Sequence, residues 1–196
     1  MSRLPGLPPE QPDDAQRELF DEIVRSRADG GSFSLFAADG ALAGPFNLMV
    51  HDPSLGRHWS ALGARLRFGS VLERRVVELV ICTVGALYQA EFEFAAHAPL
   101  AQAAGVDSRV LEALTRGEIP QFAAPEDATA FEITSIALRG GRVDAVRYAR
   151  ALELIGRAGL VELASLVGYY AALAVGLNLF DADPPTGVER IWPDTI

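Results

Sequence analysis

The chain has 196 residues, of which 49% are hydrophobic and 22% charged, which suffices for one domain with a sizeable buried core. Its formal net charge of -9 argues against nucleic acid and anionic membrane surfaces as partners, because both select for clustered lysine and arginine. The single cysteine, Cys82, excludes an internal disulfide, an internal dithiol and a cysteine-based zinc site. With no secretory leader pattern after Met1, we expect a cytoplasmic protein.

The first part of the chain is predicted to contain one helix between two irregular segments. Residues 4–9 are rich in proline and are expected to be extended. A helix with one apolar stripe begins at Asp13 or Asp14 and ends near residues 29–31. Residues 32–47 are predicted to be irregular, because glycine and proline interrupt their apolar runs. We expect a single domain over 1–196, in which about the first 40 residues form an N-terminal helical extension.

Two longer helices are predicted in the middle of the chain. The first begins at Asp52 and runs to about Arg67. The second covers residues 71–87, a nearly continuous apolar stretch that is typical of a helix buried on most sides. Ser70 followed by Glu73 has the spacing of a capping box, which would start this second helix.

Further helices are predicted to fill the rest of the chain. Their expected ranges are 91–104, 107–114, 126–138, 144–155 and 160–180, with a turn at Gly159 between the last two. No strand-like alternation of useful length interrupts them. The sequence therefore predicts an all-α fold.

The last predicted helix contains an uncharged stretch, residues 163–180, which is about the lower limit for spanning a bilayer. Tyrosines lie in its middle and basic flanks are missing, so we interpret it as a buried core helix rather than a membrane span. Small residues recur in it at every fourth position, namely Gly168, Ala172 and Gly176. Such a stripe lets another helix approach closely, either from the same chain or from a neighbouring subunit. We expect a homo-oligomer, whether a trimer, a hexamer or another assembly.

Ionisable side chains within apolar helices are the remaining chemical clue, because the sequence lacks the common phosphate-binding, zinc-protease and nucleophile-elbow motifs. Glu78 lies in the apolar run 76–81, so it either faces a polar pocket or is desolvated with a raised pKa. Glu93 and His97 are one helical turn apart, on a face whose apolar neighbours indicate that His97 points inward. A carboxylate and an imidazole in one dry pocket can exchange protons near neutral pH. In the simpler alternative, Glu93 only complements the helix dipole and His97 is a core residue.

Four segments of the chain resemble the carboxymuconolactone decarboxylase superfamily, which also contains the alkylhydroperoxidase D proteins. They are residues 44–53, 72–80, 90–97 and 161–170, and the acidic helix followed by the histidine helix is the most specific part. The resemblance implies a helical bundle of the alkylhydroperoxidase D type. Because the chain is longer than the minimal decarboxylase, the identity of the substrate does not carry over.

The thiol-dependent branch of this superfamily carries a Cys-x-x-Cys pair one turn before a histidine, with a glutamate on the preceding helix. In this sequence His97 matches the histidine and Glu78 the glutamate, but the two cysteine positions hold Ala90 and Glu93. Cys82 lies inside the central apolar helix, where a thiol is most often an inert core residue. The resemblance therefore implies the non-redox branch, a lyase that uses no metal or organic cofactor and acts on a small carboxylated or lactone-like metabolite.

The chemistry of that branch assigns roles to three residues. Loss of carbon dioxide from an unsaturated lactone acid leaves an enolate-like carbanion, which needs a proton donor and a group that stabilises the oxyanion. We expect His97 to donate the proton, and Glu93 to orient His97 or to share in the proton transfer. Glu78 would hold this network together from the neighbouring helix.

Substrate binding should require a cation, because an ionised glutamate repels the substrate's carboxylate. Arg74 and Arg75 are the nearest candidates in the sequence, with solvated positions at a helix start as the alternative. By the same resemblance, Asn47 and His51 line the pocket entrance, with turn and cap roles as the alternative. We interpret the neighbouring aromatic residues as core or interface residues, namely Trp59, Phe92, Phe94 and Tyr169.

Two other functions stay open at this point. A divergent antioxidant protein of the alkylhydroperoxidase D type would have to rely on Cys82 alone for peroxide chemistry. A non-catalytic helical binding or scaffold protein would keep the fold without turnover. The first predicts oxidation of Cys82 by peroxide, and the second predicts that His97 and Glu78 can be replaced without loss of function.

Overall fold

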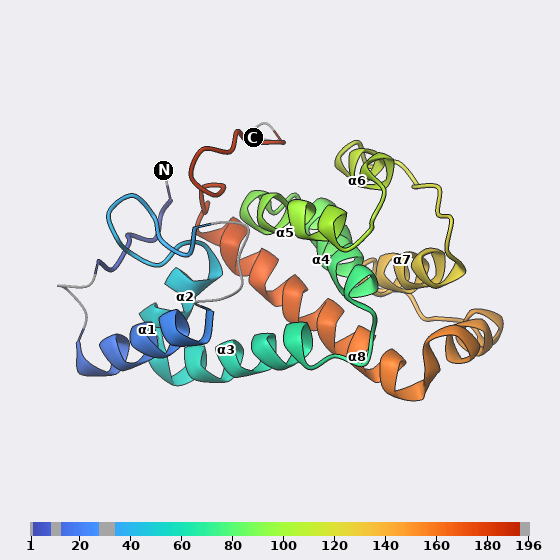
Figure 1. Cartoon of the computed structure of the whole chain (residues 1–196), viewed down its shortest axis with the longest axis horizontal. Helices are drawn as coiled ribbons and strands as arrows, with labels where there is room; N and C mark the ends of the chain where they lie inside the picture. Colours follow the sequence, from blue (N-terminus) through green and yellow to red (C-terminus); the bar gives the residue numbers. More distant parts are fainter. Residues whose placement is uncertain (1, 9–12, 28–33, 193–196) are drawn as a thin grey trace.

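The computed structural model describes residues 2–8, 13–27 and 34–192, and within these ranges the chain forms eight α-helices and no β-strand. An isolated bridge joins Phe36 and Leu42. The helices are α1 (Asp14–Arg27), α2 (Pro45–His51), α3 (Pro53–Phe68), α4 (Arg74–Tyr88), α5 (Glu91–Ala103), α6 (Ser108–Thr115), α7 (Pro125–Leu138) and α8 (Ala145–Leu179) (Figure 1). The predicted all-α fold class is confirmed.

Helix α4 is the centre of the fold, because it packs against α5, α6, α7 and α8. Its residues 76–85 are all buried, as the continuous apolar stretch predicted. In Figure 1, α4 lies between α5 and α7 and crosses α8. A polar side chain on such a helix has to find its partners inside the protein.

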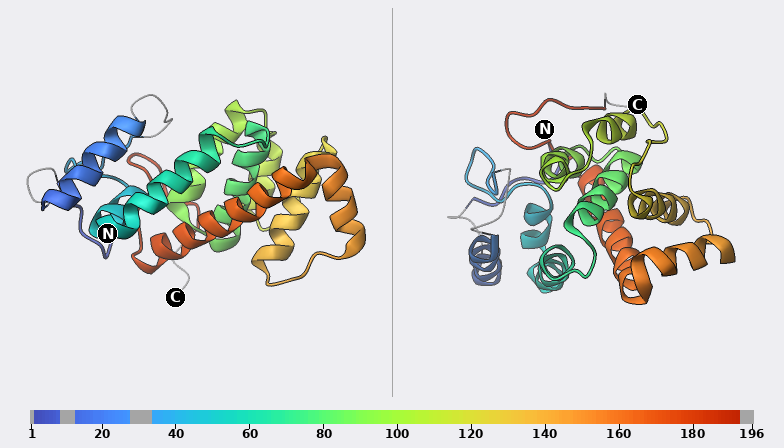
Figure 2. Two further views of the ribbon diagram at one scale, coloured as in Figure 1. Left: turned by 90° about the horizontal axis from the view of Figure 1, so that it is seen from below. Right: turned by 45° about the vertical axis from the view of Figure 1, so that its right-hand side comes forward.

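Helix α8 consists of two helical parts with a break between them, as the sequence predicted, but the break is not at Gly159. The break is a kink at Gly156, whose φ of 75° and ψ of 167° lie in a region that only glycine adopts readily. Gly159 is helical and buried, and it lets α8 pass close to Leu72. The left view of Figure 2 shows the long part of α8 running alongside α3.

Helix α8 also has the length and hydropathy of a membrane span, the only helix of the described chain that does. In its most apolar eighteen-residue window 39% of the residues are buried. One face packs on α4 and α7, whereas Val161, Val175 and Leu179 on the other face are more than half exposed. Helix α8 therefore contributes one face to the core and leaves an apolar face uncovered.

Helix α2 lies where the sequence predicted mostly irregular structure. It begins with Pro45 in its first turn, and Phe46, Met49 and Val50 are buried at the spacing of one helical face. Gly44 precedes it with a φ of 55°, and a Cβ there would overlap the Phe92 ring. The glycine that was expected to interrupt the segment is therefore what allows α2 to start beside α5.

The predicted capping box at the start of α4 is wrong. The helix begins at Arg74, and Glu73 makes no side-chain cap. The Ser70 hydroxyl instead donates to a carboxylate oxygen of Glu162 on α8 (2.6 Å), which also accepts from the Val71 amide (2.8 Å). A partner distant in the sequence has replaced the local one that the spacing predicted.

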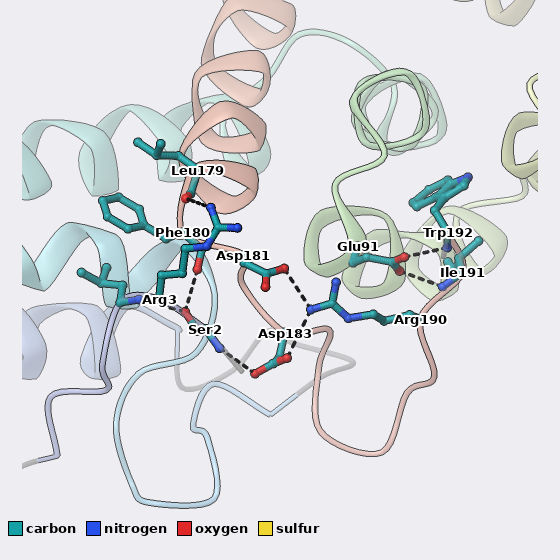
Figure 3. Close-up of polar contacts among 11 residues, drawn as sticks. Ser2, Arg3, Glu91, Leu179, Phe180, Asp181, Asp183, Arg190, Ile191 and Trp192 are labelled. Carbon is teal, nitrogen blue, oxygen red and sulfur yellow. Dashed lines mark hydrogen bonds and ion pairs between the residues drawn. The ribbon is translucent and has the colours of Figure 1, made fainter. Parts of the chain in front are cut away.

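The two terminal segments lie side by side at the end of α8 (Figure 3). The Arg3 amide donates to the Phe180 carbonyl (2.7 Å), and the Ser2 amide donates to Asp183 (3.2 Å). Further on, both carboxylate oxygens of Glu91 accept backbone N–H groups, from Ile191 (2.8 Å) and Trp192 (2.6 Å). These contacts fasten the C-terminal segment, residues 181–192, to the first turn of α5. The predicted end of the first helix at residues 29–31 lies outside the described residues.

Candidate functional site

A short connection folds α5 back onto α4. Gln89 takes the left-handed conformation with a φ of 51°, and the Ala90 amide donates to the Gly85 carbonyl (2.8 Å). Gly85 has no Cβ, which would lie 3.1 Å from the backbone nitrogen of Phe94. The close approach of the two helices brings Glu78 and His97 together, although they are nineteen residues apart.

Glu78 and His97 form a buried hydrogen bond, with 2.7 Å between Oε2 of Glu78 and Nδ1 of His97. Glu78 is fully buried and His97 is 7% exposed. The second oxygen of Glu78 forms an ion pair with Arg74 (2.7 Å) and lies 3.8 Å from Nη2 of Arg67. Tyr170 packs its ring edge-on against the imidazole. The glutamate thus has an imidazole on one oxygen and guanidinium groups on the other.

The environment lowers the pKa of both residues. Burial alone would raise the pKa of Glu78, but its hydrogen bond to His97 and the charges of Arg67 and Arg74 outweigh burial and lower it. Burial lowers the pKa of His97 more than Glu78 raises it. Near neutral pH the pair is therefore a carboxylate and a neutral imidazole. Nδ1–H donates to Glu78, and Nε2 keeps its lone pair.

Glu93 differs from Glu78 in having no hydrogen-bond partner in the described chain and a raised pKa. It is 3% exposed, and neither of its carboxyl oxygens has a hydrogen-bond partner among the described residues. Burial raises its pKa well above the usual range, so the side chain is a neutral carboxylic acid near neutral pH. Glu78, and not Glu93, makes the hydrogen bond that orients His97.

Glu93 and His97 line a cavity of about 30 Å³. Arg27 and Arg67 also line it, and its walls are otherwise apolar or aromatic, with Pro45, Phe46, Met49, Phe92, Tyr169, Tyr170, Leu173 and Leu177. Phe92 and Tyr169, interpreted from the sequence as core or interface residues, are buried and form part of these walls. Gly63 leaves room for Tyr169, whose hydroxyl donates to the Trp59 carbonyl (3.0 Å).

Arg27 and Arg67 are site residues that the sequence analysis missed. Arg27 is the last residue of α1, and Arg67 lies in the last turn of α3. Basic residues at helix C-termini are commonly solvated and complement the helix dipole, so their pattern carries no sign of a pocket. The side chain of Arg67 is only 8% exposed. Only the packing of α1 and α3 against the rest of the molecule brings the two residues to one cavity.

The other predicted binding residues lie away from this cavity. Arg74 reaches the site only through its ion pair with Glu78. Arg75 forms ion pairs with Asp127 on α7 and with Glu73. Asn47 and His51 both donate to the Pro5 carbonyl, at 3.2 Å and 3.0 Å, and so fasten the N-terminal segment to α2. The structure joins Glu78, His97 and Arg74 in one network and places Glu93 in the same cavity without a hydrogen bond in the described chain. It leaves Arg75, Asn47 and His51 outside.

Asn47 lines a separate hollow of about 290 Å³, which lies between the two terminal segments and is open to solvent. Phe92 contributes to the walls of both this hollow and the buried cavity. Among the described residues, no three His, Cys, Asp or Glu side chains converge as metal ligands. The buried cavity is therefore the place where acid, base and cationic groups of this chain meet.

Cys82 is fully buried on α4. Burial, together with the carboxyl groups of Glu78 and Glu93, raises the pKa of its thiol well above the usual range. A thiol in such surroundings stays protonated and is a poor nucleophile.

No protein-family model and no curated protein match the sequence. Solved structures do match. One is an uncharacterised peroxidase-related protein from Ralstonia eutropha JMP134, described as an alkylhydroperoxidase AhpD core, with a TM-score of 0.75 and 14% identity over 94% of this chain and 93% of that one. Another is a variant of the debrominase Bmp8 in complex with 2,3,4-tribromopyrrole, with a TM-score of 0.71 and 10% identity over 95% of this chain and 93% of that one.

The ligand-free debrominase Bmp8 gives a similar match, with a TM-score of 0.69 and 10% identity over 93% of this chain and 92% of that one. Identities this low report the fold and not the activity. The match extends over nearly the full length of each chain. The chain has a single cysteine, Cys82, and so cannot hold a Cys-x-x-Cys pair. The chain therefore has the alkylhydroperoxidase D-like fold that the sequence motifs predicted, without the cysteine pair of the thiol-dependent branch.

Proposed function

We propose that the protein is a cofactor-independent lyase of the carboxymuconolactone decarboxylase type, acting on a small carboxylated or lactone-like metabolite. The observation that carries the proposal is the 2.7 Å hydrogen bond between Glu78 and His97, beside an unpartnered carboxyl group, Glu93, in one buried cavity. A neutral imidazole and a neutral carboxylic acid in the same cavity provide a base and an acid at the same pH.

The reaction begins with a substrate whose carboxylate is bonded to the carbon next to a carbonyl group, or to the γ carbon of an α,β-unsaturated carbonyl. The bond between the carboxylate and its neighbouring carbon breaks, carbon dioxide leaves, and the electron pair moves onto the carbonyl oxygen as an enolate. The guanidinium group of Arg67 stabilises this oxyanion within the cavity. Glu93 then gives its proton to the carbon, the enolate returns to the carbonyl, and Glu93 regains a proton from water.

The structure changes one role within this proposal. The sequence analysis assigned proton donation to His97, but burial leaves the imidazole neutral and Glu93 protonated. We therefore assign the donated proton to Glu93. His97, oriented by Glu78, is the base whose Nε2 can take a proton from a water molecule or from a substrate hydroxyl group.

A thiol peroxidase has less support. Cys82 is buried and protonated, and the positions of the thiol pair hold Ala90 and Glu93. A non-catalytic binding protein would account for a cavity, but not for a complementary acid and base beside it. Measured turnover separates the binding protein from the lyase.

The test is carbon dioxide release from a panel of lactone acids and keto acids. The wild-type protein should release carbon dioxide from at least one of them, and Glu93→Gln and His97→Gln should each reduce the rate by about 10²- to 10⁴-fold. His58→Gln, an exposed position on α3, is the matched control and should leave the rate unchanged. No release from any member of the panel, or equal rates in all four proteins, would overturn the lyase.

We also propose that the protein acts as a homo-oligomer. The uncovered face of α8 is apolar, and a Cβ added to Gly168 on this face would have no atom within 4 Å, so a large side chain there leaves the single chain undisturbed. Light scattering should give a mass of at least two chains for the wild-type protein and of one chain for Gly168→Arg. A monomeric wild-type protein would contradict the proposal.

A further inference from the structure

Two arginines line the cavity, Arg67 with a nearly buried side chain and Arg27 with a partly buried one, and both have buried nitrogen atoms without a hydrogen bond in the described chain. In Arg67, Nε and Nη2 have no hydrogen-bond partner, although the side chain is only 8% exposed. In Arg27, Nε and Nη1 have none, while Nη2 donates to the Ser60 carbonyl (3.3 Å). Buried guanidinium donors normally form hydrogen bonds, so these four nitrogens call for an acceptor, although Nη2 of Arg67 also has a long ion pair with Glu78 (3.8 Å).

The charges around the cavity do not balance. Among the residues that the structure describes, Arg27, Arg67 and Arg74 are cationic, whereas Glu78 supplies the one carboxylate, which faces Arg74, His97 and, at 3.8 Å, Arg67. Glu93 and His97 are neutral by burial. Three guanidinium groups around one carboxylate leave an excess of two positive charges in this described part of the chain, which is unfavourable in a low-dielectric interior.

The two arginines also act on each other. Burial lowers the pKa of Arg27, and the positive charge of Arg67 lowers it further. Two like charges held at one cavity repel each other unless an anion lies between them. An anion between the two guanidinium groups would attract both and offset their mutual repulsion.

Aromatic rings hold both guanidinium groups in place. The Arg27 Cζ atom lies 5.5 Å from the ring centres of both Phe46 and Phe68, and the Arg67 Cζ atom lies 5.1 Å from the ring centre of Phe68. Stacking of this kind uses the faces of a guanidinium group and leaves its N–H edges free. Free N–H edges are the part that binds a carboxylate through paired hydrogen bonds.

We propose that Arg27 and Arg67 together bind the carboxylate of the ligand, so that α1, from the N-terminal extension, is part of the binding site. The choice of a carboxylate rests on the proposed function, whereas the paired arginines stand on the structure alone. The apolar and aromatic walls favour an apolar ring attached to that carboxylate, and because the cavity has only about 30 Å³, about the space of one water molecule, such a ligand has to displace lining side chains as it binds. An uncharged relative of the same shape should bind poorly, because it leaves the guanidinium charges unmatched.

The probe is 2-furoate, a five-membered ring with one carboxylate, and its matched neutral analogue is 2-furamide. Titration calorimetry should show that the wild-type protein binds 2-furoate at least about tenfold more tightly than 2-furamide. Arg27→Gln and Arg67→Gln should each weaken 2-furoate binding by about tenfold or more and leave the weak binding of 2-furamide unchanged. Arg25→Gln, an exposed position on the same helix, is the matched control and should bind as the wild type does.

A structural role for Arg27 would give a different result. Without ligand, Arg27→Gln should melt at or above the wild-type temperature, because the variant removes a buried charge that repels Arg67. A lower melting temperature together with unchanged preference for 2-furoate over 2-furamide would overturn the inference.

Two further outcomes would also overturn it. One is a wild-type protein that binds neither 2-furoate nor 2-furamide, or both equally. The other is inorganic phosphate that binds as tightly as 2-furoate, which would indicate a phosphate site. Arginine-dependent binding of 2-furoate without carbon dioxide release from any substrate would remove the lyase and leave the carboxylate site intact. Carbon dioxide release together with 2-furoate binding that is independent of Arg27 would remove the carboxylate site and leave the lyase intact.

Discussion

Two glutamates in the first turn of α5 have opposite environments. Glu91 and Glu93 are two residues apart, and both are buried, at 7% and 3% exposure. Each carboxylate oxygen of Glu91 accepts a backbone N–H group from the C-terminal segment (Figure 3). The oxygens of Glu93 accept none in the described chain.

The difference between them is a difference in partners and not in residue type. In the sequence both are acidic residues at a helix start, where the helix dipole favours them equally. Glu91 uses its charge to hold the chain in place, and Glu93 keeps a proton that the cavity can use. A buried acid without a structural partner is the one available for chemistry.

The largest expected effect is on turnover. Glu93→Gln removes the proton donor and should reduce carbon dioxide release by about 10²- to 10⁴-fold, because an amide cannot give up a proton. Glu91→Gln should change the rate less than about tenfold, since Glu91 does not line the cavity. Turnover rates of the two variants on one substrate show which glutamate takes part in the reaction. A larger loss of rate in Glu91→Gln than in Glu93→Gln would assign the reaction to Glu91 instead.

The next effect is on stability, where Glu91→Gln should lose more than Glu93→Gln. In Glu91→Gln one backbone N–H group of the C-terminal segment meets an amide donor instead of an acceptor, which should lower the free energy of unfolding by about 1–3 kcal/mol. Glu93→Gln breaks no hydrogen bond in the described chain, so its stability should equal or exceed that of the wild type. Urea denaturation at neutral pH measures both. Equal losses in the two variants would mean that Glu93 also has a structural role.

A smaller effect is expected on the pH dependence of stability. Because the folded-state pKa of Glu93 is raised, the unfolded chain releases this proton at lower pH than the folded protein does. Stability should therefore fall as pH rises above the unfolded value of about 4.3, by about 1.4 kcal/mol per unit, until the folded-state pKa is reached. The wild type should lose this stability relative to Glu93→Gln in urea denaturation at pH 5, 6 and 7. A constant difference would show that Glu93 ionises normally.

The smallest effect is expected at Cys82, a buried ionisable group without a place in the cavity. Cys82→Ala should leave turnover unchanged and lower stability by only about 1 kcal/mol, the loss of one buried sulfur atom. Mass spectrometry after peroxide treatment should show no oxidation of the native thiol. Rapid formation of a sulfenic acid or an intersubunit disulfide would support the peroxidase instead.

The local parts of the fold could be predicted from the sequence. The predicted helix 91–104 is α5, Glu91–Ala103, because acidic residues mark its start and Gly105, with a φ of 98°, marks its end. The predicted inward orientation of His97 agrees with its burial. The catalytic roles of these residues stay predictions.

The parts that depend on distant contacts could not be predicted. Ser70 takes Glu162 as its partner, ninety-two residues away, which no local spacing indicates. Arg27 and Arg67 meet only when α1 and α3 pack beside the cavity, whereas each alone is an ordinary basic residue near a helix end. The sequence therefore indicated the acid and base of the site, and the structure was needed to find its cations.

The unpaired polar groups of the cavity have a consequence for the evolution of this protein in the laboratory. Arg67 and Glu93 have nearly buried side chains and Arg27 a partly buried one, and none is fully hydrogen-bonded in the described chain, so apolar substitutes at these positions should raise heat resistance. A library selected for heat resistance alone would accumulate such substitutes early. It would discard ligand recognition while the helices stayed in place, so selection would have to include a ligand to keep the cavity intact.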